Sequence, residues 1–75
     1  MFDKNFFSER LRKVRIQNKT SQQNLADYLQ ISKQAVSMME RGQRAPSVEI
    51  LVALADYFNV SLDYLVGHSD NPERR

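Results

Sequence analysis

The chain contains no cysteine and only one histidine, His68, which lies in a polar stretch near its C-terminal end. Without cysteine it can form neither disulfides nor thiolate metal sites. A catalytic or metal centre also needs several converging groups, and a lone imidazole does not supply them. No set of nucleophile, base and orienting group can be assembled from the other residue types. The sequence therefore argues against an enzyme and predicts neither a metal nor a cofactor.

Long apolar runs are also missing. No stretch approaches the ~20 consecutive apolar residues that a membrane-spanning helix requires. The first residues, MFDKNFFSERLRKVR, lack the apolar segment of a signal peptide. No segment alternates apolar and polar residues over the length of a strand, so a β-sheet is not expected. These absences favour a cytoplasmic protein of a prokaryote or phage, with no membrane partner.

Lysine and arginine are absent from most of the second half of the chain. Between Ala45 and Glu73 there are five acidic residues and no basic one, a net charge of −5. Residues 1–44 carry nine basic and four acidic residues, a net charge of +5. One part of the molecule can therefore face a polyanion while another part faces away from it. The alternative interpretation is a chance clustering of solvated charges.

The sequence does contain a series of short amphipathic segments, which suit one small domain of 75 residues. Their helical spacing predicts an all-α fold, with helices over about residues 8–18, 22–30, 32–41, 47–58 and 62–66. The expected N-caps are Ser8, Ser21, Ser32, Ser47 and Ser61, and the expected helix ends include Gly42, Asn59 and Gly67. We expect an N-terminal arm over residues 1–7, a helical domain over 8–67 and a polar tail over 68–75.

The same spacing predicts which side chains are buried. The expected core positions are Phe7, Leu11, Val14, Leu25, Ala26, Leu29, Ile31, Val36, Met39, Val48, Leu51, Leu54, Ala55, Phe58, Val60, Leu62 and Leu65. Val52, Tyr64 and Val66 fall outside the main stripes. Exposed apolar groups near one end of a small domain often mark an interface. Because that end lacks cations, two copies can approach each other there, and we expect a homodimer.

Residues 22–41 predict a helix-turn-helix motif. Two short helices joined by a few residues must cross steeply if their apolar faces are to share one core. Ala26 supplies the small side chain where the helices meet, and Ile31 supplies a buried plug in the turn. The helix over about 32–41 is then the recognition helix.

The outward face of this second helix carries short, amide-bearing and cationic side chains rather than the glutamate and lysine mixture of a solvated surface. The candidates for base readout are Ser32, Lys33, Gln34, Ser37 and Met38. Glutamine can pair with adenine, lysine can reach guanine acceptors, and serine can bond to several base edges. An outward methionine either touches a thymine methyl or covers neighbouring apolar surface.

Cationic and amide side chains near this helix are candidates for phosphate contacts. Those that end or follow the second helix are Arg41, Gln43 and Arg44. On the first helix, Arg10, Arg12 and Lys13 are either phosphate contacts or solvated charges.

Three blocks of the sequence, RLRKVR, SQQNLADYLQISKQAVSMMERG and APSVEILVALADYFNVSLDYLVG, resemble the XRE-type helix-turn-helix domain of phage Cro proteins and repressors. The resemblance runs from about Leu11 to Leu65. It implies a five-helix bundle of the lambda-repressor type, with the third helix in the major groove. It also implies that Gln22 binds a DNA phosphate and that Arg15 and Glu40 form a buried ion pair.

Two positions depart from the family pattern. Gln30 stands in the turn where the family usually has glycine, so a positive φ there implies modest strain. Lys19 and Thr20 stand where the family usually has Gly-Leu before the second helix.

The leading functional prediction is sequence-specific binding of double-stranded DNA by a transcriptional regulator, a repressor that acts as a homodimer on a palindromic operator. The alternative is an antitoxin or accessory module whose main partner is a protein and whose DNA binding is autoregulatory. In that case the acidic second half, with an exposed Tyr57 or Tyr64, is the docking face.

Overall fold

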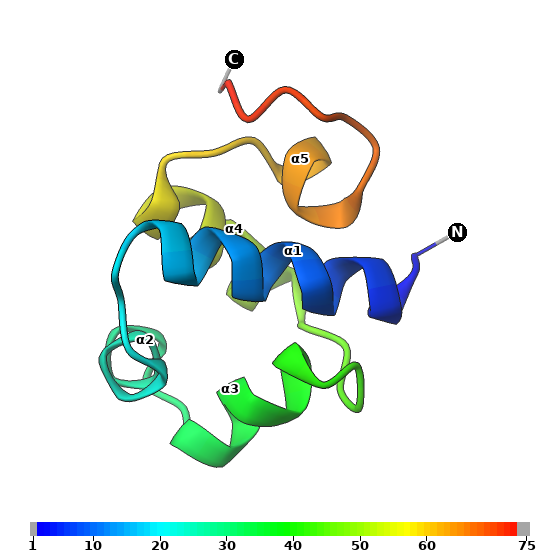
Figure 1. Ribbon diagram of the computed structural model, residues 1–75. Coiled ribbons are helices and arrows are strands. Elements are labelled where there is room, and N and C mark those ends of the chain that lie inside the picture. Colours follow the sequence, from blue (N-terminus) through cyan, green and yellow to red (C-terminus); the bar gives the residue numbers. More distant parts are fainter. Residues whose placement is uncertain (1, 74–75) are drawn as a thin grey trace.

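The computed structural model describes residues 2–73, which form five helices and no strand. The helices are α1 (Lys4–Gln17), α2 (Gln22–Leu29), α3 (Lys33–Glu40), α4 (Val48–Phe58) and α5 (Leu62–Val66). In Figure 1, α1 lies across the middle of the molecule, with α5 on one side of it and α2 and α3 on the other. The predicted all-α fold is confirmed. Within the described part of the chain, no helix has the length and apolar character needed to cross a membrane.

Serine side chains start four of the five helices, as the sequence predicts. The hydroxyl oxygens of Ser21, Ser32, Ser47 and Ser61 each accept a hydrogen bond, at 3.0–3.1 Å, from the backbone N–H three residues later. Each bond satisfies one of the backbone donors that a helix start leaves unpaired.

The first helix begins earlier than expected. Asp3 is its N-cap and accepts from the backbone N–H groups of Asn5 and Phe6. Ser8, the expected cap, is a buried residue inside the helix, and its hydroxyl donates to the carbonyl oxygen of Asn5. The expectation of a helix start at Ser8 is wrong, and residues 4–7 belong to α1 instead of an arm. The reason is packing, since Phe7 is completely buried in the core.

Three non-glycine residues have positive φ, namely Lys19, Gln30 and Asn59, and the first two stand at the departures noted in the sequence. Gln30 ends α2 with φ 58° and ψ 41°, which confirms the expected strain at this position. Lys19, between α1 and α2, has φ 54°. The α1–α2 junction is nevertheless tied down, because Arg15 Nη1 donates to the carbonyl oxygen of Thr20 at 2.9 Å.

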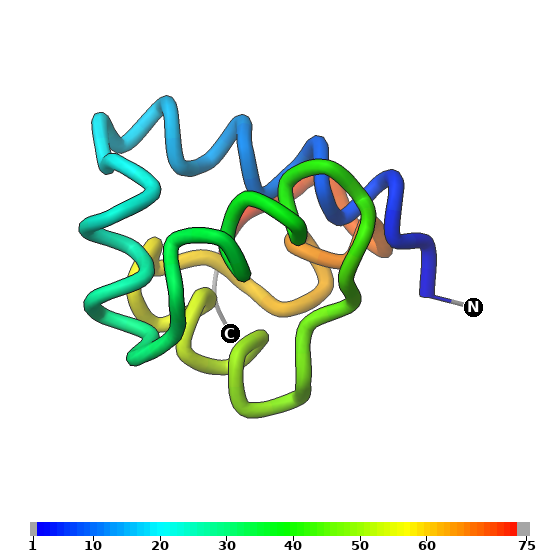
Figure 2. The backbone as a smooth tube through the Cα atoms, turned by 90° about the horizontal axis from the view of Figure 1, so that it is seen from below, coloured from blue at the N-terminus to red at the C-terminus, as the bar shows by residue number. Residues whose placement is uncertain are grey.

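One hydrophobic core joins all five helices, with contributions from Phe7, Leu11, Val14, Leu25, Ala26, Leu29, Val36, Met39, Leu54, Ala55, Phe58, Val60, Tyr64 and Leu65. Residues far apart in the sequence meet there, because α1 packs against both α3 and α5. Figure 2 shows the loop after α3 passing beside the N-terminal half of α1.

Three of the expected burial assignments are wrong. Val48, expected in the core, is 75% exposed, although it shares a helix face with the buried Ala55. Tyr64, expected outside the main stripes, is buried against Arg10 of α1. Leu62 of α5, also expected in the core, is 43% exposed, whereas Val52 is exposed as expected.

Candidate nucleic-acid interface

The packing of α2 against α3 is set by the apolar side chains buried between the two helices. Leu25 and Ala26 of α2 and Val36 and Met39 of α3 are buried together. The turn is closed by the backbone N–H of Ile31, which donates to the carbonyl oxygen of Ala26 at 3.1 Å. Figure 1 shows α2 nearly end-on and α3 from the side, so the two helix axes cross steeply. This is the arrangement expected of a helix-turn-helix.

Burial of Val36 and Met39 leaves the opposite face of α3 outward. Ser32, Lys33 and Gln34 are exposed there, and Ser37 and Met38 are half-buried. Within residues 2–73 the side chains of Lys33 and Gln34 form no hydrogen bond or ion pair with the protein. Ser32 is partly committed, because its hydroxyl oxygen caps α3 at 3.0 Å. The exposed side chains of Lys33 and Gln34 are therefore free to bond with a ligand.

The carboxylate of Glu40, the last residue of α3, is the meeting point of three elements. Arg15 of α1 donates to it through Nε, to Oε2, and through Nη2, to Oε1 at 3.1 Å. Gln22, at the start of α2, donates to the same Oε1 at 3.2 Å. The side chains of Glu40 and Arg15 are 4% and 15% exposed. The ion pair that the resemblance implied is present, and it fixes α3 against both α1 and α2.

Gln22 and the loop after α3 are brought close together by this contact. Gln22 bonds to Glu40, and Arg41 follows directly in the chain. The loop residues Gln43 and Arg44 are exposed, and the backbone N–H of Gln43 donates to the carbonyl oxygen of Met38 at 2.9 Å. The expected phosphate contacts therefore lie at the start of α2 and in the segment that directly follows α3.

Gly42 holds this loop against α1, a contact that the sequence analysis missed. Its φ is 73°, and a Cβ atom at Gly42 would lie only 2.8 Å from Oδ1 of Asn5. The loop that carries Arg44 is therefore positioned by the first turns of α1, which the sequence analysis assigned to an arm. The sequence does contain one signal for this earlier start of α1, namely Asp3, because aspartate is favoured at helix N-caps.

A protein-family model described as helix-turn-helix matches residues 11–65 of the chain. The chain belongs to this family. The match runs from Leu11, midway along α1, to Leu65 in α5, and it confirms the resemblance to XRE-type domains.

Two transcriptional regulators of the helix-turn-helix type are similar to this chain in sequence. The chain is 43% identical over 65 residues to YqaE, an uncharacterised HTH-type transcriptional regulator of Bacillus subtilis strain 168, covering 87% of this chain and 56% of that protein. It is 41% identical over 59 residues to the HTH-type transcriptional regulator AnsR of the same organism, covering 79% of this chain and 51% of that protein. The chain thus spans about half the length of these relatives.

Two solved structures of helix-turn-helix proteins superpose closely. The P22 c2 repressor, solved in complex with a synthetic operator, has a TM-score of 0.79 and 33% identity, covering 85% of this chain and 97% of that one. The restriction-modification controller protein C.AhdI of Aeromonas hydrophila has a TM-score of 0.77 and 32% identity, covering 84% and 96%.

Arg10 does not belong to the outward basic surface of this helix-turn-helix domain. Its side chain is 8% exposed and lies over the ring of Tyr64, with 3.9 Å from Cζ to the ring centroid. Its Nη2 pairs with Asp70 at 3.2 Å. The guanidinium is therefore enclosed, and the expectation that Arg10 is a phosphate contact or a solvated charge is wrong. Arg12 and Lys13, two and three residues further along α1, are exposed.

Proposed function

We propose that this helix-turn-helix domain binds double-stranded DNA sequence-specifically, with α3 in the major groove, and represses transcription in the cytoplasm of a prokaryote or in phage infection. The observation that supports it most is the outward face of α3, where Lys33 and Gln34 are exposed and their side chains form no hydrogen bond with the described part of the protein. The names of the relatives and the operator-bound P22 c2 repressor support this proposal.

Base readout and phosphate binding fall to different residues in this proposal. Gln34 and Lys33 read base edges, with Ser32, Ser37 and Met38 beside them. Phosphates are bound by Gln22, Arg41, Gln43 and Arg44, which lie at the two ends of the α2–α3 unit. Gln22 donates one amide hydrogen to Glu40, so its second N–H remains for a phosphate oxygen.

The proposed regulator acts as a homodimer on a palindromic operator. The exposed apolar side chains Val48, Val52 and Leu62 of α4 and α5 are the surface for this contact, in place of the buried Tyr64. The segment that carries them has no cation between Ala45 and Glu73, so each basic half stays free for DNA. A two-fold pair places two copies of α3 in successive major grooves, about 34–36 Å apart.

Selection of bound sites from random duplexes tests this function. The expected result is an enriched half-site repeated as a palindrome with its centres about one helical turn apart. The same selection with the Gln34→Ala variant should lose the enrichment at one base position in each half-site. Recovery of unrelated sequences by the unmodified chain would contradict sequence-specific binding.

The protein-docking alternative receives no support from its aromatic residues. Tyr64 is buried, and Tyr57 is half-buried between Tyr28 and Phe58, with ring centroids 4.5 and 5.0 Å away. A docking face built on Tyr57 or Tyr64 therefore loses most of its apolar surface to the core. Co-purification of an unrelated protein at a fixed ratio would revive this alternative.

A further inference from the structure

The segment after α5, residues 68–73, folds back over the bundle and is held at a few points. The backbone N–H of His68 donates to the carbonyl oxygen of Asp63 at 2.8 Å, and that of Ser61 to the carbonyl oxygen of Pro72 at 3.0 Å. Between these points Asp70 pairs with Arg10. Figure 1 shows the segment returning from the end of α5 toward the connection between α4 and α5.

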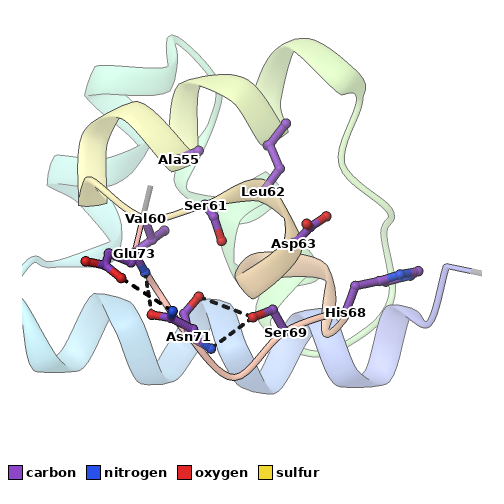
Figure 3. A pocket seen from close by; sticks show the side chains of 9 residues that line it. All are labelled: Ala55, Val60, Ser61, Leu62, Asp63, His68, Ser69, Asn71 and Glu73. Carbon is purple, nitrogen blue, oxygen red and sulfur yellow. Dashed lines mark hydrogen bonds between the residues drawn. The ribbon is translucent and has the colours of Figure 1, made fainter. Parts of the chain in front are cut away.

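This segment covers a hollow instead of packing into the core. The hollow has a volume of about 540 Å³, and Ala55, Leu62, Asp63 and Asn71 are among the side chains that line it. In Figure 3 the side chains of Ser69, Asn71 and Glu73 bond mainly within the segment itself. Asp70, its one charged contact with α1, has a fully exposed side chain. Little apolar burial therefore holds the segment in place.

Arg10, by contrast, is rigidly built into the fold. Its guanidinium carbon lies 3.9 Å from the ring centroid of Tyr64 and 4.9 Å from that of Phe6. The Phe6 ring is itself confined, because a Cβ atom at Gly67 would lie 2.6 Å from it. Stacking against aromatic rings fixes the plane of a guanidinium and leaves its N–H edges to select a partner.

The pairing of Arg10 with Asp70 is incomplete. Nη2 donates to Asp70, whereas Nη1 is buried and has no hydrogen-bond partner. A buried donor without a partner is costly, and arginine can engage both oxygens of a carboxylate with two parallel bonds. A second hollow, of about 190 Å³, lies beside the guanidinium and is lined by Phe6, Glu9, Arg10 and Lys13. Lys13 brings a positive charge to this hollow and Glu9 a negative one, so the net charge of its lining is that of Arg10.

We propose that Phe6, Arg10 and Tyr64 form a carboxylate clamp for an acidic peptide segment, and that residues 68–73 occupy it through Asp70 as an internal ligand. An external segment whose carboxylate bonds to Nη2 displaces Asp70 from the clamp. The clamp is separate from the DNA-binding face, because Arg10 contacts the α5 side of α1 while Arg15, five residues on, contacts α3.

Peptide titration of the full chain carrying Asp70→Asn tests the clamp. The probe is a hexapeptide with the sequence of residues 68–73, HSDNPE, and the matched probe is HSNNPE, which lacks the central carboxylate. NMR signals of the Arg10 Nε–H group and of the Tyr64 and Gly67 amides report occupancy. The expected result is saturable binding of HSDNPE, with HSNNPE about tenfold weaker because it lacks the charged acceptor.

Two further proteins complete the experiment. The unmodified chain should bind HSDNPE less tightly than the Asp70→Asn chain, because its own Asp70 competes at a local concentration on the order of millimolar. Chain carrying Glu73→Gln, an equally exposed change in the same segment, should behave like the unmodified chain.

The proposal fails if the Asp70→Asn chain binds both peptides equally, or binds neither at concentrations on the order of 10 mM. Either result would show that residues 68–73 contribute to the fold but do not occupy a binding site. Adding Arg10→Lys to the Asp70→Asn chain keeps the charge but removes the planar fork, so the preference for HSDNPE should disappear. DNA binding by the Asp70→Asn chain should be unchanged, so failure here leaves the proposed function standing.

Discussion

The side-chain amide of Gln22 donates to Oε1 of Glu40 at 3.2 Å, and this bond joins the start of α2 to the end of α3. The same oxygen accepts from Arg15 of α1. Glu40 therefore orients a proposed phosphate-binding side chain as well as holding three helices together. A substitution at Glu40 should affect both stability and DNA binding, which separates it from changes at the surface.

Glu40→Ala should strongly destabilise the fold. Removing one partner of a mostly buried ion pair leaves an uncompensated charge, here on Arg15, and costs about 3–5 kcal/mol. The free energy of unfolding, measured in urea, should fall by this amount. Glu49→Ala is the matched control, because Glu49 is exposed in the first turn of α4. Equal urea midpoints for the two variants would show that the Arg15–Glu40 pair contributes little.

Gln34→Ala should weaken binding to the selected operator by about 1–3 kcal/mol and relax the preference at one base position. The reason is that an exposed, uncommitted amide loses its paired hydrogen bonds to a base edge. Affinity for unrelated duplex should barely change. Titration of both duplexes with the variant measures this, and an equal loss for the two would assign Gln34 to phosphate contact.

Arg44→Gln should reduce the salt dependence of DNA binding. Each neutralised phosphate contributes about −0.9 to the slope of log affinity against log salt, so the slope should become shallower by about that much. Titrations between low and physiological salt measure the slope for both chains. Identical slopes would remove Arg44 from the phosphate contacts, and a flat response in the unmodified chain would remove DNA as the partner.

Gln30→Gly should stabilise the protein by about 0.5–1 kcal/mol, because glycine adopts a left-handed conformation without the strain of a side chain. Gln23→Gly, the same chemical change inside α2, should destabilise it by about 1 kcal/mol. Thermal unfolding of the two variants measures the difference. A loss of stability in both would mean that the backbone at Gln30 carries no strain.

Val52→Asp should weaken self-association, since it places a charge in the proposed apolar contact between two copies. Ile16→Asp is the control, because Ile16 is an exposed apolar residue on α1, outside that surface. Sedimentation with and without a palindromic duplex compares the variants. Unchanged association of the Val52→Asp chain would place the dimer contact elsewhere.

Local chemistry was enough to predict much of this protein from its sequence. Serine caps at Ser21, Ser32, Ser47 and Ser61 and the helical spacing of apolar residues place the last four helices within a residue or two. These signals act between neighbours in the chain, so they need no knowledge of the fold. The resemblance to XRE-type domains supplied the Arg15–Glu40 pair, which spacing alone did not predict.

Tertiary structure decided the features that depend on which surfaces meet. Val48 has the spacing of a core residue but no neighbour to cover it, whereas Tyr64 is buried because α1 brings Arg10 over its ring. The same contact makes Arg10 an internal residue among exposed cations of α1. Burial is a property of two surfaces in contact, so the periodicity of one helix predicts its apolar face but not whether another element covers it.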